Sequence, residues 1–238
     1  MASRPVFKAV AEFPYVKAIP TEFKFYSGFA LEQAQKSVDS LHQAYIETHL
    51  EDMGKILEVS TRSKSKLGYA LSAFNLHYRM SNGLEYPLEC VFQSSKCFEE
   101  NKQYKDLLYV SAREAKKDSR LMESGKLIGF KLEGRNFPLV PRTLFYDFIY
   151  ITALMQHEYL ADEVKAYSAF TDIAFNPGKS INCQARAVAL FVALSKTELL
   201  NKVMEDVDSF ADIVYSKEHS VKTAEKFTQL TLFDLGLC

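Results

Sequence analysis

The chain begins with loosely alternating apolar and polar residues, a pattern typical of β-strands. Pro14 and Pro20 interrupt the pattern, which favours short strands at the edge of a sheet. The most regular alternation puts Leu76 and Tyr78 on one face, and the Asn82-Gly83 pair that follows predicts a hairpin turn. The strands predicted in this way lie within residues 5–26, 55–61, 74–80, 84–86 and 127–132.

Apolar residues that recur every three or four positions predict helices over most of the remaining chain. Ser27 is a candidate N-cap for the first helix, and Ser180 or Asn182 for a later one, while residues 170–179 are predicted to be a loop. The predicted helices cover residues 29–48, 87–98, 111–124, 143–157, 160–169, 180–200, 197–214 and 217–230. We therefore expect an α+β fold that is predominantly helical, with a small N-terminal β-hairpin or sheet.

Composition restricts the classes of protein that fit. The chain has 238 residues, 47% of them hydrophobic, and a net charge of −1, so no overall field attracts it to nucleic acid or membrane. Residues 1–13 contain no apolar signal-peptide core, and the apolar runs 148–155 and 187–194 are too short to cross a bilayer. We expect a cytoplasmic protein without membrane contact, whose contacts with a phosphate chain come from a local patch.

Cysteine and histidine give no sign of a metal site. Cys90, Cys97, Cys183 and Cys238 form no C-x-x-C motif, so we expect buried reduced thiols. The five histidines are scattered along the chain and contain no H-E-x-x-H motif. The sequence therefore predicts neither a metal nor another cofactor.

One stretch combines three polar residues at helical spacing. If a helix starts at Pro87, then Glu89, Gln93 and Lys96 fall within an arc of about 60°. Such a stripe is either a solvated face or a polar site. The apolar residues on the other sides of this helix leave little of it for water, which favours a polar cleft.

Two further stretches are candidates for a functional site. A helix N-terminus near Lys179 and Arg186 suits a phosphate, although an ordinary capped helix explains the same residues. Gly178-Lys179-Ser180 is not the end of a P-loop, because the required first glycine is Ile173. A basic stretch interleaved with Glu114 and Asp118 predicts a solvated face; its members are Arg113, Lys116, Lys117 and Arg120.

Several of these residues also follow the motif order of a known family. Leu71-Ser72-Ala73-Phe74-Asn75, followed by Glu89, Gln93 and Lys96, resembles the signature of the NADAR (YbiA-like) family. The similarity is greatest to the members paired with DarT-type toxins, which ADP-ribosylate guanine in DNA. The segments similar to that subgroup are residues 28–31, 111–116, 145–147 and 170–186. The chain departs from the family pattern at Ala73 and Cys90, and it has no tryptophan for the usual Trp-Gly element.

The resemblance implies a NADAR-like single domain over residues 1–238, with a core at about 28–200 and a C-terminal helical extension at about 201–238. It also implies an ADP-ribosyl glycohydrolase that removes ADP-ribose from guanine in DNA, as antitoxin to a DNA ADP-ribosyltransferase. Lys96 would form a Schiff base, Glu89 would transfer protons, and Asp172 is the candidate for a second acid or base. The implied ligand-binding residues are Ser72, Phe74, Asn75, Gln93, Asn176, Lys179, Asn182 and Arg186. The implied partners are ADP-ribosylated DNA, ADP-ribose as product and a DarT-type toxin.

Other classes of function stay open on the sequence. One is a pocket that binds ADP-ribose or NAD without turnover, or that sequesters a toxin. Another is an N-glycosidase acting on a small phosphorylated metabolite. A purely structural helical protein is the third, and a closed Glu89 helix without any cleft would support it.

Overall fold

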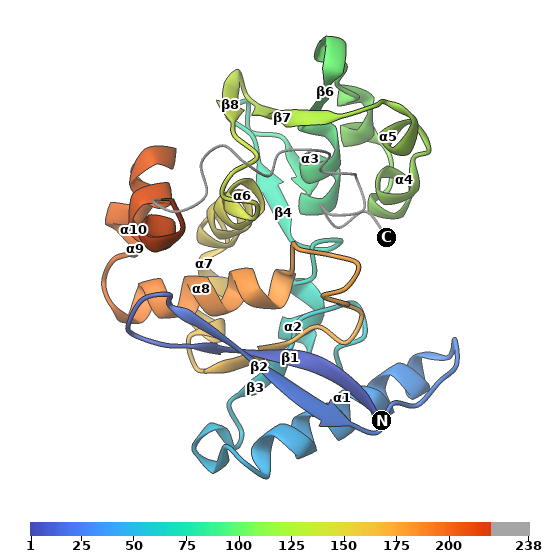
Figure 1. Ribbon diagram of the computed structural model, residues 1–238, viewed down its shortest axis with the longest axis vertical. Helices are drawn as coiled ribbons and strands as arrows, with labels where there is room; N and C mark the ends of the chain where they lie inside the picture. Colours follow the sequence, from blue (N-terminus) through green and yellow to red (C-terminus); the bar gives the residue numbers. More distant parts are fainter. Residues whose placement is uncertain (220–238) are drawn as a thin grey trace. The chain divides into compact units, whose positions relative to one another are not determined.

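The computed structural model of the chain describes residues 1–219 (Figure 1). The backbone forms two compact units, and each is assembled from separate stretches of sequence. The first contains Met1–Ser72, His157–Pro177 and Cys183–Asn201; among the described residues, the second contains Ala73–Gln156, Gly178–Asn182 and 202–219. Because the chain passes several times between the units, neither is a continuous segment, and the single-domain organisation stays a prediction.

The first unit is built on a four-stranded sheet in the order β2-β1-β9-β3. Strand β1 (Ala2–Ala9) pairs antiparallel with β2 (Val16–Phe23) over its whole length, which confirms the N-terminal hairpin. Strand β9 (Ala169–Thr171) lies between β1 and β3 (Ile56–Glu58), antiparallel to the first and parallel to the second. Segments that are far apart in the sequence therefore meet at the centre of this sheet.

Helices cover both faces of that sheet, with α1 (Leu31–Ile46) on one face and α8 (Gln184–Lys196) on the other (Figure 1). Nine of the 13 residues of α8 are apolar and buried, and its polar residues lie at its two ends. The core beneath α1 contains Val6, Phe23, Val38, Leu41, Tyr45, Ala169 and Ile173. The shorter helices of this unit are η1 (Leu50–Asp52), α2 (Lys66–Ala70) and α7 (Glu158–Val164).

The second unit starts with the predicted hairpin, formed by β4 (His77–Arg79) and β5 (Glu85–Pro87), which leads straight into helix α3 (Leu88–Ser94). A three-stranded sheet follows in the order β6-β7-β8. Its strands are β6 (Lys96–Phe98), β7 (Leu127–Leu132) and β8 (Arg135–Phe137). The helices are η2 (Glu99–Asn101), η3 (Lys105–Tyr109), α4 (Ala112–Lys117), α5 (Arg120–Glu123), α6 (Leu144–Met155) and α10 (Val207–His219), and α9 (Leu200–Val203) joins the units.

Aromatic rings form the centre of the second unit. Phe145 of α6 stacks on Phe130 of β7 with ring centroids 4.4 Å apart, and Phe137 meets it edge-on at 4.9 Å. Phe92 of α3 contacts Phe130 at 5.6 Å and Tyr146 at 5.2 Å. These contacts anchor α3 to both the sheet and α6, so the helix that carries the polar residues is held on its apolar side.

Several predicted elements are wrong in extent. The predicted helix at 160–169 ends at Val164, and the predicted loop at 170–179 begins inside β9. The strand expected at 74–80 is limited to His77–Arg79, since residues before it form a turn. The predicted helix at 111–124 breaks at Asp118 into α4 and α5, although Gly125 does end it with a φ of 78°.

The predicted helix caps are also wrong. Helix α1 starts after Ala30 and α8 after Cys183, and neither N-cap residue supplies a side-chain hydrogen bond. Ser27, Ser180 and Asn182 therefore cap no helix, because each helix begins one or more residues later than its polar candidate. The predicted helix at 197–214 is resolved into α9 and α10, and most of the one at 217–230 lies outside the described residues.

The fold is mixed α+β as predicted, but "predominantly helical" is too strong. Helices cover 44% of the described residues and strands 19%, and within residues 1–219 the strands form three sheets, of four, two and three strands. Within residues 1–219, no helix combines the length and the apolar character needed to span a membrane.

Gly68 of α2 gives a test of the packing in the first unit. A Cβ atom at this position would lie 2.0 Å from the carbonyl oxygen of Glu58 and 2.4 Å from the hydroxyl oxygen of Ser63. We expect Gly68→Ala to lower the free energy of unfolding by about 1–3 kcal/mol, because the backbone of β3 must shift. The neighbouring Tyr69 is 50% exposed, so Tyr69→Ala should change it by less than about 0.5 kcal/mol. Urea denaturation of both variants measures the difference, and equal stability would contradict the close contact.

Candidate active site

Helix α3 is fixed at its start by the segment that precedes the hairpin. Pro87, predicted as the first helical residue, occupies the N-cap position with φ −52° and ψ 135°, so the helix starts one residue later than predicted. The backbone N–H of Glu89 donates to the carbonyl of Ala73 at 2.9 Å, which satisfies a donor of the first turn. The two motif segments noted in the sequence are therefore joined by a backbone hydrogen bond.

Three buried polar side chains form a continuous chain of hydrogen bonds along α3. The amide nitrogen of Gln93 donates to Oε1 of Glu89 at 2.8 Å, and Nζ of Lys96 donates to Oε1 of Gln93 at 2.7 Å. Their exposed fractions are 6% for Glu89, 1% for Gln93 and 0% for Lys96. The interpretation of this stripe as a solvated face is therefore wrong, because the side chains lie inside the protein.

Lys96 does not belong to the helix that was predicted to carry it. Helix α3 ends at Ser94, and Lys96 is the first residue of β6, where it pairs with Phe130 of β7. The hydroxyls of Ser94 and Ser95 both donate to the carbonyl of Val91, at 3.1 Å and 2.7 Å. Such bonds compete with the helical pattern and favour its end at this point. The amine still reaches Gln93, because the chain turns immediately after the helix.

The environment of Lys96 favours its neutral form. Burial lowers the pKa of the Lys96 amine well below its usual value, and Lys116 lowers it further, while the carboxylate of Glu89 raises it. The ammonium would also lie 4.8 Å from the centroid of the Phe92 ring, a contact that partly offsets desolvation. A buried amine of lowered pKa can act as a nucleophile toward a carbonyl or an imine.

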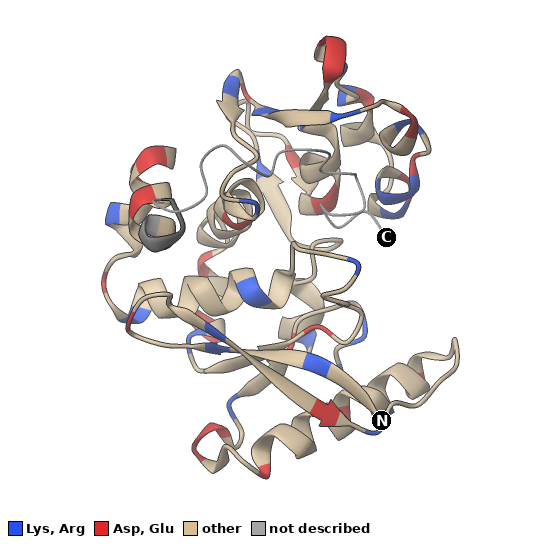
Figure 2. Cartoon of the chain, viewed as in Figure 1, with Lys and Arg blue, Asp and Glu red and all other residues tan. Residues whose placement is uncertain are grey.

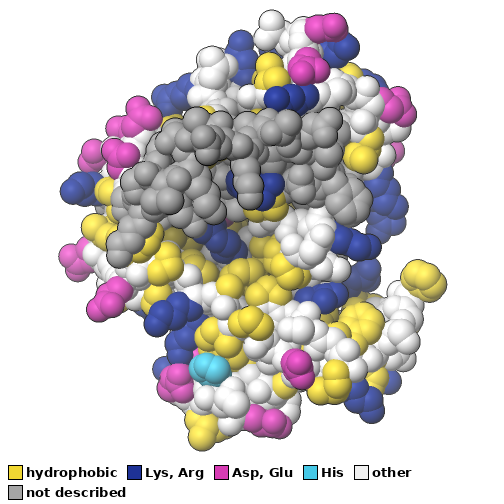
Figure 3. Space-filling view, in the orientation of Figure 1, with side chains coloured by type: hydrophobic (Ala, Val, Ile, Leu, Met, Phe, Trp, Pro, Cys, Tyr) yellow, Lys and Arg dark blue, Asp and Glu magenta, His cyan; other side chains and the backbone are white. Residues whose placement is uncertain are grey.

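Lys116 belongs to the basic stretch that was predicted to be a solvated face. Its ammonium lies 5.6 Å from the centroid of the Phe74 ring, so α4 contacts the segment that precedes the hairpin. The capping box of Ser111 and Glu114 fixes the start of α4 and so the position of Lys116. Figure 2 shows basic residues gathered on α4, whereas Figure 3 shows acidic and basic side chains interspersed over the visible face. Arg113 and Lys117 are exposed, as predicted for a solvated face, and Lys116 is half-buried.

Arg120 is also held in place by neighbouring groups. Its guanidinium donates to Asp118 at 2.8 Å and to Asp106 at 2.6 Å, and it lies 4.5 Å from the centroid of the Tyr104 ring. The pKa of Asp118 is lowered, chiefly by this hydrogen bond from Arg120. Arg120 therefore connects α5 to η3, and its positive charge is paired with two carboxylates of the protein.

Asp172 lies in the first unit, directly after β9, and is 9% exposed. Its Oδ1 accepts a hydrogen bond from the backbone N–H of Ala174 at 3.0 Å, and its Oδ2 accepts one from the side-chain amide of Gln184 at 3.1 Å. The backbone bond belongs to a tight turn of the kind that aspartate often forms. The carboxylate is therefore fixed in orientation by its own loop and by the first residue of α8.

Glu58, which the sequence did not single out, holds both neighbours of Asp172. Its carboxylate accepts hydrogen bonds from the Thr171 hydroxyl at 2.6 Å, from the Ile173 backbone N–H at 2.9 Å and from the Ser60 hydroxyl at 2.6 Å. Burial raises the pKa of Glu58, and these three donors oppose that rise. Glu58 follows an apolar strand with no polar motif around it, so only the three-dimensional pairing of β3 with β9 reveals its role.

His42 extends this network from helix α1. Its Nε2 lies 2.8 Å from the Thr171 hydroxyl, and that hydroxyl donates to Glu58, so Nε2 of His42 is the donor of the bond. Burial lowers the pKa of His42 to about 4, which keeps the ring neutral near pH 7. The polar groups beside Asp172 thus form one chain from α1 through β9 to β3.

The remaining predicted ligand-binding residues are divided between the units. Ser72 belongs to the first unit, where its hydroxyl donates to the carbonyl of Tyr69 at 2.8 Å; the other members of this unit are Asn176 and Arg186. The second unit contains Phe74, Asn75, Lys179 and Asn182 together with Glu89, Gln93 and Lys96. Side-chain hydrogen bonds join Glu89, Gln93 and Lys96 to one another. Among residues 1–219, no group of three or more His, Cys, Asp or Glu side chains is arranged to hold a metal ion.

The lowered pKa of Lys96 predicts a specific dependence of stability on pH. The ordinary value of 10.5 applies to the unfolded chain, so between the folded value and 10.5 the unfolded chain binds more protons. The free energy of unfolding should therefore rise with pH across this window. We expect Lys96→Met to raise stability at neutral pH and to flatten this rise, whereas Lys126→Met, at an exposed position, should leave the slope unchanged. Urea denaturation between pH 7 and pH 10 measures both, and an unchanged slope in Lys96→Met would rule out the desolvated amine.

Comparison with known proteins identifies a family. Residues 2–224 match the model of the family described as DarT1-associated NADAR antitoxin, and the matched part includes both motif segments. A search of curated proteins found no match. Because the family match extends over almost the whole sequence, the chain belongs to the DarT1-associated NADAR antitoxins.

Proposed function

We propose that this protein is an N-glycosyl hydrolase that removes ADP-ribose from guanine bases in DNA. The observation that supports the proposal most directly is the buried chain from Lys96 through Gln93 to Glu89. It offers an amine of lowered pKa and a carboxylate within one small site, joined by an amide that does not titrate. Membership of an antitoxin family associated with DarT1 supports the choice of substrate.

In the proposed reaction the ribose ring opens first. The C1–O4 bond of the ribose breaks, O4 takes a proton, and C1 forms an iminium with the exocyclic nitrogen of guanine. The neutral amine of Lys96 adds to C1 and passes a proton to the guanine nitrogen, and the C1–N bond to guanine then breaks. The base leaves intact, and the ribose stays on Lys96 as a Schiff base. Water hydrolyses that Schiff base, which frees the amine and lets the ribose close again.

Glu89 would transfer protons in this sequence. Protonated, it would supply the proton that O4 needs on ring opening; ionised, it would accept a proton from the water that attacks the Schiff base. Gln93 separates the two groups, so the carboxylate need not contact the amine directly. Since Lys96 is fully buried, a neighbouring side chain must move before the sugar can reach it.

The other candidate residues would hold the substrate. We propose that Ser72, Asn75 and Gln93 bind ribose hydroxyls and that Phe74 covers the sugar or the base. Asp172 would serve as a second acid or base or as a ribose ligand, since its loop fixes the carboxylate. The diphosphate would be bound by Asn176, Lys179, Asn182 and Arg186. A guanine in duplex DNA must be presented unpaired or flipped out, at a cost of a few kcal/mol.

In the cell, this activity would reverse the damage done by a DNA ADP-ribosyltransferase toxin of the DarT type. An antitoxin that acts on the product does not need to bind the toxin. A protein that only sequesters the toxin or holds ADP-ribose would retain binding and release nothing from modified DNA. Product formation therefore separates the proposed enzyme from a binding module.

Replacement of Lys96 tests the nucleophile. Lys96→Ala and the volume-matched Lys96→Met should both lose release of ADP-ribose from ADP-ribosylated DNA, because neither supplies an amine. Borohydride added during turnover should reduce the Schiff base and attach the sugar to the peptide that contains Lys96. Lys126→Ala is the control and should keep full activity, because the residue is exposed. Full activity in the folded Lys96→Met variant would remove the amine from the mechanism.

Replacement of Glu89 tests the proton transfer. Glu89→Gln keeps an oxygen that accepts from Gln93 but cannot exchange a proton, so we expect the rate to fall by about 10²- to 10⁴-fold. Asp172→Asn, which also preserves shape, should lower the rate if that carboxylate transfers protons, and should raise KM instead if it only binds ribose. Steady-state kinetics on an ADP-ribosylated oligonucleotide distinguishes these results. A Glu89→Gln variant with wild-type kcat would contradict the assigned role.

A further inference from the structure

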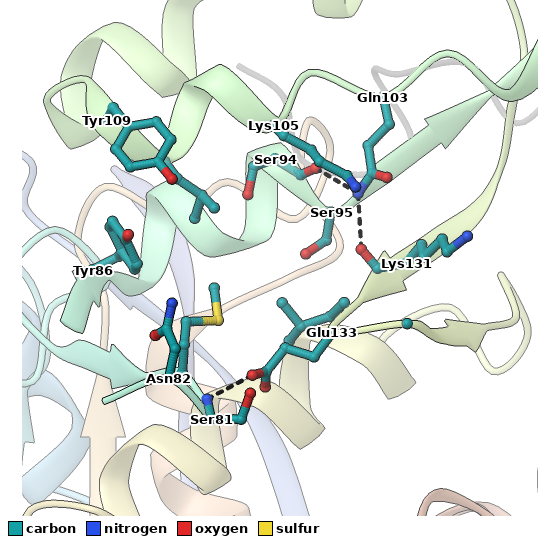
Figure 4. A pocket seen from close by; sticks show the side chains of 14 residues that line it. Ser81, Asn82, Tyr86, Ser94, Ser95, Gln103, Lys105, Tyr109, Lys131 and Glu133 are labelled. Atoms are coloured by element: carbon teal, nitrogen blue, oxygen red, sulfur yellow. Dashed lines mark hydrogen bonds between the residues drawn. The ribbon is translucent and has the colours of Figure 1, made fainter. Parts of the chain in front are cut away.

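The second unit contains a pocket on another side of α3. This tyrosine pocket, of about 600 Å³, lies among the β4–β5 turn, the end of α3, η3 and the β7–β8 turn (Figure 4). Ser94 and Ser95 line it, but Glu89, Gln93 and Lys96 do not. On an ideal helix Ser94 is rotated about 140° from Glu89, so the two sites use different faces of α3. The volume is in the range of ordinary ligand pockets, about 300–1,000 Å³.

One wall of the tyrosine pocket is aromatic. Tyr86, from the end of the hairpin, and Tyr109, from η3, meet edge-to-face with ring centroids 5.7 Å apart (Figure 4). Tyr109 is 75% exposed, which leaves a large ring open to water beside the pocket. Exposed tyrosines held by rigid neighbours are suitable surfaces for stacking of a flat ring such as a nucleobase.

Another wall carries positive charge. Lys105 and Lys131 both line the pocket and are exposed, and neither forms an ion pair with any residue in the range 1–219. The two lysines come from different elements, Lys105 from η3 and Lys131 from β7. The amide of Gln103 donates to the carbonyls of Ser94 and Lys131, at 2.9 Å each, which fixes this wall.

The third side of the pocket is polar and carries a carboxylate. Oε1 of Glu133 accepts a hydrogen bond from the backbone N–H of Ser81 at 2.6 Å, and Asn82 lies beside them (Figure 4). A carboxylate repels phosphate but accepts hydrogen bonds from the amino group of a base. The pocket therefore offers separate places for a flat ring, for an anion and for a hydrogen-bonding edge.

We propose that the tyrosine pocket binds one nucleotide of single-stranded DNA that flanks the modified guanine. The base would stack on Tyr109 with its edge against Tyr86, and its phosphate would face Lys105 and Lys131. The chain as a whole carries a charge of −1, so a DNA contact of this kind must come from a local group of cations. This inference rests on the proposed function, because it takes DNA as the substrate.

Binding of a fluorescent, unmodified single-stranded oligonucleotide to the full chain tests the proposal by anisotropy. Tyr109→Ala should weaken binding by about 5- to 150-fold, the range found for the loss of one base–aromatic stack. The double variant Lys105→Ala/Lys131→Ala should lower the slope of log Kd against log salt by about 0.7 for each lost phosphate contact. The matched controls are Tyr159→Ala, at a tyrosine that is 76% exposed, and the double variant Lys36→Ala/Lys202→Ala, at two exposed lysines. Both controls should bind as the wild type does.

Two further measurements separate this inference from the proposed function. If the pocket holds a neighbouring nucleotide, Tyr109→Ala raises KM for an ADP-ribosylated oligonucleotide and leaves kcat unchanged, and free dGMP competes poorly for the pocket. Wild-type affinity in both pocket variants, or competition by dGMP as strong as that of the oligonucleotide, would overturn the inference even if the enzyme is active. Conversely, loss of oligonucleotide binding in the variants would support the pocket even if no ADP-ribose were released.

Discussion

The geometry of the site depends on the burial of one amine. Lys96 lies wholly inside the second unit, where a charge is costly, and its nearest polar partner is the amide of Gln93. A carboxylate in direct contact would hold the amine charged and unreactive. An amide accepts the same hydrogen bond and carries no charge. Its nitrogen donates to Glu89 and so fixes the orientation of that carboxylate. The order carboxylate, amide, amine therefore keeps the amine positioned while its pKa is lowered.

The first unit also contains a buried ionisable group that is held by neutral hydrogen-bond partners. The buried carboxylate of Glu58 fixes the residues on both sides of Asp172, and a neutral His42 supports the same hydroxyl. Breaking one member of such a buried network leaves the others without partners, at a cost that exceeds one ordinary hydrogen bond. The loop that carries Asp172 is thus held by groups that take no part in the proposed chemistry.

The sequence predicted the elements whose signal is local. The β1–β2 hairpin, β7 and the apolar helix α6 appear close to the expected positions, because proline placement, alternation and helical periodicity act within each segment. Strand β9 was missed because three residues show no period, and its partners are remote in sequence. At the site, Glu89 and Gln93 lie on α3 as expected, whereas Lys96 reaches them from β6. Glu58 had no sequence signal, since only tertiary pairing brings it to Asp172.

Cys90 and Cys183 are buried, and this determines how their thiols react under oxidative stress. Burial raises the pKa of Cys90 to about 11, and its Sγ donates to the carbonyl of Val110 at 3.3 Å. Burial likewise raises the pKa of Cys183 well above its usual value. Peroxides and alkylating reagents attack thiolates, and these two groups stay protonated. Burial thus protects both core cysteines from oxidation in a cell under oxidative stress.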